Sequence, residues 1–249
     1  MNNNFKRVCG LVSVVLLLGL AGCGSLSVTN VRAVNASPGL ATPYAIQVGE
    51  IQIVFDLSYG VEGVLPQGQY GAADTSGAYR PVGAETNEPV LVYAQTASSP
   101  MAQTSQTLLQ NDFYTIVTTS PAPNIAIQVL TDDDTPPQSG DYKLRFMDTS
   151  TQAGPIDVYV VPQGTNLNNA TPVLSGITNG QVSAYLQLAP GSYVMQVTRY
   201  GVKTSVLYSV VFAPAANGIY SAFFLDPPSA SSTDYSVLVT TDPVEAPVK

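Results

Sequence analysis

The feature that most constrains the fold of this chain is the lack of a helical pattern after residue 23. No window there repeats its apolar residues with a helical period for more than about two turns. Short runs rich in Val, Thr and Tyr alternate instead with Gly, Pro, Asn and Asp, as in strands separated by turns. In 181–188, for example, Val182, Ala184 and Leu186 stand at alternate positions, the pattern of a half-buried strand. We therefore predict an all-β chain.

Two series of short strands are expected. The first series would use residues 31–35, 44–48, 51–57, 90–95, 107–110, 113–118 and 125–130, with a weak candidate at 78–82. The second series is more regular and would use residues 142–148, 156–161, 181–188, 192–198, 206–212, 219–225 and 235–240. About seven short strands in roughly 100 residues are typical of an immunoglobulin-like β-sandwich.

The second series also repeats the first in sequence. LRFMDTS (144–150) corresponds to VRAVNAS (31–37), and PIDVYV (155–160) corresponds to PYAIQV (43–48). Matched segments lie 106 to 123 residues apart, which is too long for a solenoid unit of about 20–50 residues and fits a duplicated domain. We predict two tandem immunoglobulin-like β-sandwich domains at 31–135 and 142–245, joined by a Pro- and Gly-containing linker at 136–141.

The N-terminus resembles the export signal of bacterial lipoproteins. Two basic residues precede an apolar run at 8–18, and the run is followed by four residues that match a lipobox, Leu20, Ala21, Gly22 and Cys23. A basic start, a short apolar core and small residues before the cut mark a secretory signal, whereas a membrane span needs about 20 apolar residues. The resemblance implies removal of residues 1–22, acylation of the Cys23 thiol and a tether at 23–30.

A transmembrane helix, or a plain signal peptide with a chance cysteine, would be the alternatives. Two or more acyl chains on Cys23 would anchor the chain stably to a membrane. Gly24 stands where lipoproteins held at the inner membrane usually carry Asp. We therefore expect a lipid-anchored protein of the cell envelope, at the outer membrane if the cell is Gram-negative.

The charge of the chain argues against nucleic-acid binding. The whole sequence has 9 basic and 17 acidic residues, and cleavage of the signal would remove Lys6 and Arg7 and leave a net charge of −10. Nucleic-acid-binding surfaces are basic, and anionic lipid headgroups would repel this chain. Membrane contact should therefore come from the lipid. Since Cys9 would leave with the signal and Cys23 would be acylated, the mature chain could form no disulfide.

Four segments carry a family likeness, at residues 31–38, 133–137, 155–160 and 190–193. They resemble the bacterial family catalogued as domain of unknown function 4397, whose members are secreted or lipid-anchored and often carry the domain in tandem. The resemblance implies a β-sandwich at the cell envelope. It brings no assigned activity and no catalytic residues.

The residue content narrows the chemistry that the chain could perform. Since the sequence has no histidine, it excludes Ser-His-Asp and Cys-His nucleophile systems and the common zinc ligand sets. A glycosidase would need only two facing carboxyls. The first domain offers five candidates for such a pair, Asp56, Glu62, Glu85, Glu88 and Asp112. Solvated surface acids are the alternative interpretation of these residues.

Asp132, Asp133 and Asp134 form the densest acidic cluster, directly before the linker. Calcium binds six to eight oxygens, many of them from carboxylates, so this cluster is a candidate Ca²⁺ site, with Asp141 and Asp148 as further ligands. The alternative is a solvated linker, since the spacing is not that of an EF-hand. No other cofactor is expected.

The 14 tyrosines could form a face on which sugars stack, although strand packing would also explain them. We predict a lipid-anchored, non-catalytic binding or structural module that displays its two domains to an envelope protein or a polysaccharide. A carboxylate-dependent glycan-processing enzyme is the alternative.

Overall fold

The computed structural model describes residues 27–39, 43–63, 79–94, 97–229 and 231–244. Within these ranges the regular structure consists of strands and of one short 3₁₀ helix, Leu167–Asn169, which confirms the all-β prediction. The described part contains no helix with the length and apolar character that a bilayer span requires. The immunoglobulin-like topology and the domain limits stay predictions.

The strands up to residue 132 form a first sandwich of two sheets. They are β1 (Val28–Asn35), β2 (Tyr44–Val48), β3 (Ile51–Leu57), β4 (Glu62–Gly63), β5 (Arg80–Gly83), β6 (Glu88–Ala94), β7 (Ala102–Gln106), β8 (Phe113–Thr119) and β9 (Ala126–Asp132). One sheet has the order β4-β1-β8-β9, with β5 also paired to β1, and the other has the order β3-β2-β6-β7.

The strands from residue 142 onward form a second sandwich. They are β10 (Tyr142–Asp148), β11 (Ile156–Pro162), β12 (Leu174–Ile177), β13 (Leu186–Leu188), β14 (Tyr193–Arg199), β15 (Val202–Phe212), β16 (Ile219–Leu225) and β17 (Ser236–Thr241). Their sheets have the orders β13-β10-β16-β17 and β12-β11-β14-β15. The two sandwiches therefore share one arrangement, with β10, β16 and β17 in the places of β1, β8 and β9.

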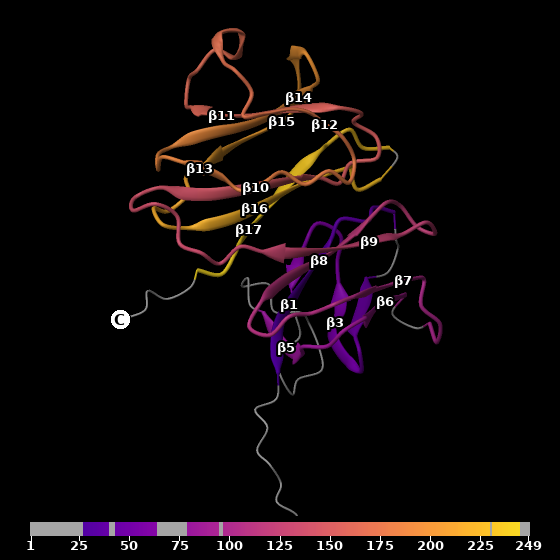
Figure 1. Cartoon of the computed structure of the whole chain (residues 1–249). Coiled ribbons are helices and arrows are strands. Elements are labelled where there is room, and N and C mark those ends of the chain that lie inside the picture. The colour runs from indigo at the N-terminus through magenta and orange to yellow at the C-terminus, as the bar shows by residue number, and fades with distance from the viewer. Residues whose placement is uncertain (1–26, 40–42, 64–78, 95–96, 230, 245–249) are drawn as a thin grey trace, which may run out of the picture.

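The two sandwiches stack through their inner sheets, so that four sheets lie in succession (Figure 1). Each inner sheet contains a parallel pair, β1 with β8 and β10 with β16. These strands are buried along almost their whole length, because each covers a core on one face and the other sandwich on the opposite face. The side chains between the sandwiches include Val34, Ala36, Val117, Met147, Phe223 and Leu225.

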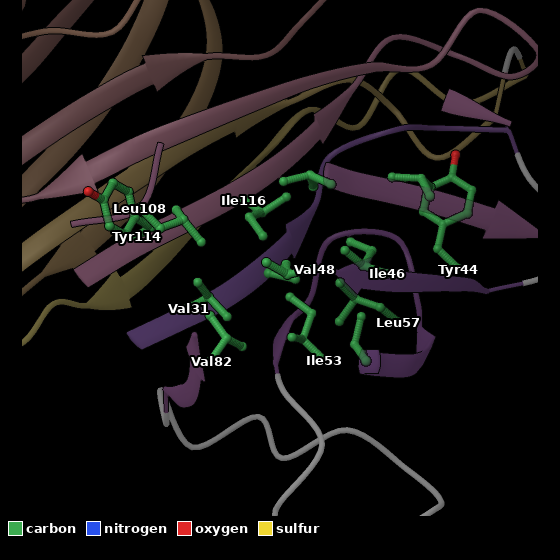
Figure 2. Close-up of a cluster of buried hydrophobic side chains, with 14 of the residues drawn as sticks. Val31, Tyr44, Ile46, Val48, Ile53, Leu57, Val82, Leu108, Tyr114 and Ile116 are labelled. Atoms are coloured by element: carbon green, nitrogen blue, oxygen red, sulfur yellow. The ribbon is translucent and has the colours of Figure 1, made fainter. Parts of the chain in front are cut away.

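The core of the first sandwich lies between its two sheets. Figure 2 shows Val31 and Ile116 of the inner sheet facing Ile46 and Ile53 of the outer sheet. Alternation along the strands produces this arrangement, since Tyr44, Ile46 and Val48 point inward from β2. The intervening positions of β2 therefore face outward from the sandwich.

The core of the second sandwich contains more aromatic residues. Tyr142 makes edge contacts with Phe212 and Tyr220, at ring-centroid distances of 5.8 and 6.3 Å. Phe224 stacks on Tyr235 at 5.3 Å. Most of these rings come from positions where strand alternation directs side chains inward, so packing accounts for a large share of the tyrosines.

Two of the expected strands are wrong, and two further strands, β4 and β12, were missed. Residues 107–110 form no strand, and Ala102–Gln106 is the strand instead. In 181–188 only Leu186–Leu188 is a strand, because the Ser183 hydroxyl accepts the Phe146 N–H at 3.0 Å and replaces part of the ladder. Of the missed strands, β4 has only two residues, and the four residues of β12 include Gly176 with a φ of +66°.

Candidate functional site

The outer face of sheet β3-β2-β6-β7 carries a shallow hollow of about 270 Å³. We name it the aromatic hollow, and its lining includes Ala45, Gln47, Gln52, Phe55, Tyr93 and Ala94. Phe55 is 39% exposed, which is unusual for a ring on a sheet face. The described lining residues carry no charge.

Strand alternation and one small residue create this hollow. Ala45 lies between the inward-pointing Tyr44 and Ile46, so its own side chain faces outward. It pairs directly with Tyr93 on β6, and a methyl group beside a ring leaves a depression. Gln47, two residues along β2, donates its side-chain N–H to the Gly49 carbonyl at 2.6 Å, which orients its amide.

This lining suits an uncharged ligand with both apolar and hydroxyl surfaces. An aromatic ring provides a flat apolar area for stacking, and Tyr adds a polar tip. The two glutamine amides can each donate and accept hydrogen bonds. A pyranose ring, with an apolar face and a rim of hydroxyls, matches this combination.

A second hollow of about 530 Å³ holds three glutamates at one end of the first sandwich. Glu50, Glu85 and Glu88 line it together with the turn at Gly49. A side chain at position 49 would collide with the Glu88 carboxyl, since a Cβ there would lie 1.6 Å from Oε1. Burial raises the pKa of Glu88, and the negative charges of Glu85 and Glu50 raise it further.

The structure separates the other candidate carboxylates from this hollow. Glu62 accepts a hydrogen bond from Arg32 at 3.1 Å, and Asp112 accepts one from the Tyr114 hydroxyl at 3.2 Å. Asp56 is exposed on β3. Of the five acids considered from the sequence, Glu85 and Glu88 lie together in this hollow.

The region between the sandwiches contains a buried ionic network. Arg32 donates from Nη2 to the Asp242 carboxylate and from Nη1 to the Thr241 carbonyl at 2.7 Å. Its Nε donates to the Thr115 hydroxyl at 2.9 Å, and its guanidinium lies 4.7 Å from the centre of the Tyr79 ring. A β1 residue is thus bound to the end of β17.

Arg145 makes the reciprocal contacts from the second sandwich. It donates to the Asp132 carboxylate at 2.5 Å, to the Thr131 carbonyl at 2.9 Å and to the Ser221 hydroxyl at 3.0 Å. Its guanidinium lies 4.8 Å from the centre of the Tyr185 ring. The two sets of contacts have nearly two-fold symmetry, and together we call them the interface network.

Asp132, the first residue of the acidic cluster before the linker, is a member of the interface network. Besides Arg145, the Asp132 carboxylate accepts hydrogen bonds from Tyr79 at 2.8 Å and from Thr115 at 2.7 Å. Asp133 pairs with Lys143 at 2.6 Å. Calcium would have to displace these partners, and its binding at Asp132, Asp133 and Asp134 stays an untested prediction.

The two further ligands suggested for calcium lie elsewhere. The Asp141 carboxylate accepts a hydrogen bond from the Gln187 amide at 3.2 Å. Asp148 is buried at the end of β10, where it accepts the Ser150 N–H at 2.9 Å. Among the residues that the structure describes, no three His, Cys, Asp or Glu side chains group in a way that could hold a metal ion. The lipobox residues Leu20, Ala21, Gly22 and Cys23 lie outside the described residues.

Comparison with protein families gives a match over residues 29–159, just over half of the chain, to the family described as Domain of unknown function (DUF4397). The chain belongs to this family. The match begins in β1 and ends within β11. The expected DUF4397 membership is therefore confirmed, on a match that contains 31–38, 133–137 and 155–159, while 190–193 lies outside it. No curated protein matches the chain.

Three solved structures show weak similarity to this DUF4397 chain. An alpha-glucan-binding streptococcal virulence factor has 11% identity and a TM-score of 0.27, with 86% of this chain and 97% of that chain covered. The glycogen-degrading pneumococcal virulence factor SpuA has 10% identity and a TM-score of 0.27, with 88% and 22% covered. A candidate cell adhesion protein from Bacteroides fragilis has 11% identity and a TM-score of 0.20, with 88% and 100% covered. At these TM-scores the similarity carries no argument about this chain.

Sequence reasoning did not identify the residues of the aromatic hollow. The general expectation of a tyrosine face on a strand included Tyr93 only as one of 14 tyrosines. A usable signal was present in YAIQV (44–48), where a small and an amide residue occupy the outward positions. The outward direction of Phe55 could not be read in this way, because register shifts interrupt the pairing of β2 with β3.

Proposed function

We propose that this DUF4397 chain is a lipid-anchored, non-catalytic module of the cell envelope that binds a neutral polysaccharide. The aromatic hollow is the observation that supports this proposal. It combines the partly exposed Phe55 and Tyr93 with two amides on an uncharged sheet face. The inner sheets are covered on both faces by the stacking of the sandwiches, so the outer sheets provide the surfaces for a ligand.

The rigidity of the hollow favours binding. Its side chains project from three hydrogen-bonded strands, and sites on strands lose less conformational freedom than sites on loops. The lining presents few titratable groups that could act on a bound sugar. Binding without chemistry is therefore the simplest use of this face.

Polysaccharide binding can be measured by affinity electrophoresis and calorimetry with a panel of soluble α-glucan, β-glucan and mannan. Replacing Tyr93 or Phe55 by Ala should weaken binding roughly tenfold, since a stacked ring contributes about 1 kcal/mol beyond its buried area. Tyr200→Ala is the matched control, because Tyr200 is 59% exposed on the second sandwich. Binding unaffected by the first two changes, or no binding to any glycan of the panel, would refute the proposal.

The lipid anchor is the second part of the proposal, and it depends on the sequence around Cys23. Cells expressing the protein would be fed an alkyne fatty acid, and the label should enter the full-length chain but not the Cys23→Ser variant. The variant should also retain residues 1–22, because in lipoprotein signals of this kind the cysteine is acylated before the signal is cleaved. Equal labelling of both proteins would contradict lipidation at Cys23.

A glycan-processing enzyme remains a second candidate because Glu50, Glu85 and Glu88 share a hollow. A carboxyl with a raised pKa can act as a general acid, and burial shifts the pKa of Glu88 in that direction. Release of reducing ends from the same glycan panel, abolished by Glu88→Gln, would favour this candidate. Binding without release of reducing ends would favour the module.

A further inference from the structure

We propose that the second sandwich holds a separate binding site for a carboxylated saccharide, centred on Arg199. This residue ends β14, and it lines a hollow of about 450 Å³ together with Gln152, Ser205, Ser232, Thr233 and Tyr235. We name this the arginine hollow. It belongs to different strands from the aromatic hollow and does not depend on the function proposed for that face.

Arg199 differs from the three described cations that form salt bridges. Arg32, Arg145 and Lys143 each form a salt bridge with an aspartate, but within the described residues Arg199 forms no salt bridge and its one hydrogen bond joins Nη1 to the Ala153 carbonyl at 2.6 Å. This bond fixes the direction of the guanidinium and leaves its charge without a counter-ion. In a chain with 17 acidic and 9 basic residues, carboxylates are available for pairing, yet none is placed there.

Asp226, which holds the turn at residues 150–152 before the Ala153 carbonyl that Arg199 binds, is already occupied. Asp226 accepts hydrogen bonds from the Ser150 hydroxyl and from the N–H groups of Thr151 and Gln152, and its side chain is buried. Its function is to hold the turn after β10. Among the described residues, the positive charge of Arg199 therefore lines the hollow without a salt-bridge partner.

The fold itself does not need an arginine at this position. Arg199 pairs with Ile156 at the start of β11, and the matching pair in the first sandwich is Ala94 with Tyr44. The corresponding position of the first sandwich is thus occupied by alanine. A structural role for Arg199 would have to be specific to the second sandwich, whereas a ligand-binding role explains why only one of the two carries the charge.

The lining of the arginine hollow indicates which anion it would bind. A guanidinium binds a carboxylate through two parallel hydrogen bonds. Around it, Ser205, Ser232 and Thr233 offer hydroxyls and Gln152 offers an amide, groups that pair with sugar hydroxyls. Val206, Leu207, Pro227 and Tyr235 add apolar area on which the face of a sugar ring can lie. The geometry therefore points to a uronic acid within a polysaccharide.

The test uses the full mature chain and isothermal titration with an oligogalacturonate, compared with the neutral galactose oligomer of equal length. Two variants test the role of the charge. Arg199→Gln removes the positive charge but keeps a group that can donate to the Ala153 carbonyl, whereas Arg199→Lys keeps the charge without the planar guanidinium. The wild type should bind the uronate and not the neutral oligomer. Arg199→Gln should weaken uronate binding roughly tenfold or more, and Arg199→Lys should weaken it less. Binding should also fall as salt rises, because the interaction is ionic.

Thermal unfolding of each variant would show whether lost binding follows from lost structure. Tyr93→Ala should leave uronate binding unchanged, and Arg199→Gln should leave neutral polysaccharide binding unchanged, so the two proposals can fail separately. Equal binding of the two oligomers, unchanged affinity in Arg199→Gln, or preference for an acidic peptide would each overturn the inference.

Discussion

At the scale of single residues, the most informative comparison is between Asn35 and Asp148. Each ends the first strand of its sandwich, and each accepts the N–H of the serine two residues later. Asn35 also donates to the Leu57 carbonyl at 2.9 Å, whereas Oδ2 of Asp148 is buried and lacks a partner among the described residues. Burial raises the pKa of Asp148 to about 7, the Ser150 N–H opposes this shift, and the charge of Asp226 adds to it.

We therefore predict that Asp148 makes stability depend on pH. Its folded pKa lies above the ordinary value of 3.8, so the folded state holds the proton more tightly, and stability should fall as pH rises from about 4 to about 7. Asp148→Asn should remove this pH dependence. The difference in unfolding free energy between the variant and wild type should therefore be up to about 4 kcal/mol more favourable to the variant at pH 8 than at pH 4. Urea unfolding at four pH values would measure it.

Asp234→Asn is the control for this prediction, because Asp234 is exposed. It should change the pH profile little. If the profile of Asp148→Asn also followed that of wild type, Asp148 would not be the titrating group.

Residue roles were the hardest part to predict from the sequence. From the sequence, Asp132 was a candidate calcium ligand or part of a solvated linker, and its contacts with Arg145 and Tyr79 could not be predicted. The pairing of Arg32 with Asp242 joins residues 210 positions apart, and no local pattern announces it. The matching arginines in 31–37 and 144–150 were visible as a repeat, yet only packing of one inner sheet on the other reveals what they bind.

At the scale of elements, the edge strands of the two outer sheets differ. β7 has five residues, from Ala102 to Gln106, while β15 has eleven, and exposed side chains recur along β15. Val202, Val206 and Val211 on β15 are 46%, 45% and 59% exposed. In its sheet β15 pairs with β14 along one side, and a long apolar edge strand is a template for association.

Placing a charge on this edge should therefore reduce association. We predict that Val211→Lys lowers the rate of aggregation at elevated temperature, since edge lysines oppose strand addition. The thermal midpoint should change little, because Val211 is exposed. Light scattering during incubation would measure the rate, and Leu109→Lys, at another exposed apolar residue, is the control. An equal effect of both changes would assign the result to net charge instead of to the edge.

Element prediction succeeded where alternation is regular and failed where other contacts replace the ladder. The strands at Tyr44–Val48, Ile51–Leu57 and Ile219–Leu225 have the limits expected from the sequence. In 107–110 the apolar Leu108 is buried from a loop, with its N–H bound to the Glu85 carbonyl. An apolar side chain buried from a loop gives 107–110 the composition of a strand, although these residues form no strand.

At the scale of the whole molecule, the interface network makes the two sandwiches depend on each other. Arg32 and Asp242 are both buried, with side-chain exposures of 1% and 0%. Removing one member of such a pair leaves an uncompensated buried charge, which typically costs about 3–5 kcal/mol. The apolar contacts of Met147 and Phe223 between the sandwiches reinforce the coupling.

We predict that Arg32→Ala and Arg145→Ala each destabilise the chain by about 3 kcal/mol or more, and that each turns a single unfolding transition into two. Scanning calorimetry would show this, because uncoupled sandwiches unfold separately. Lys143→Ala is the control, since its pairing with Asp133 is partly exposed and should contribute about 1 kcal/mol or less. A single transition in all variants would mean that the apolar contacts alone couple the sandwiches.

The place of β1 has a consequence for the chain under mechanical load. β1 is the first described strand, and it lies between β8 on one side and β4 and β5 on the other. For a chain held in a membrane through Cys23, as proposed above, tension from a captured polysaccharide would enter the fold at Val28 and run along this strand. The ladder bonds of β1 would then be sheared together instead of being unzipped singly. With an anchor at Cys23, extraction of β1 would thus have to break its ladder bonds to β4, β5 and β8 together.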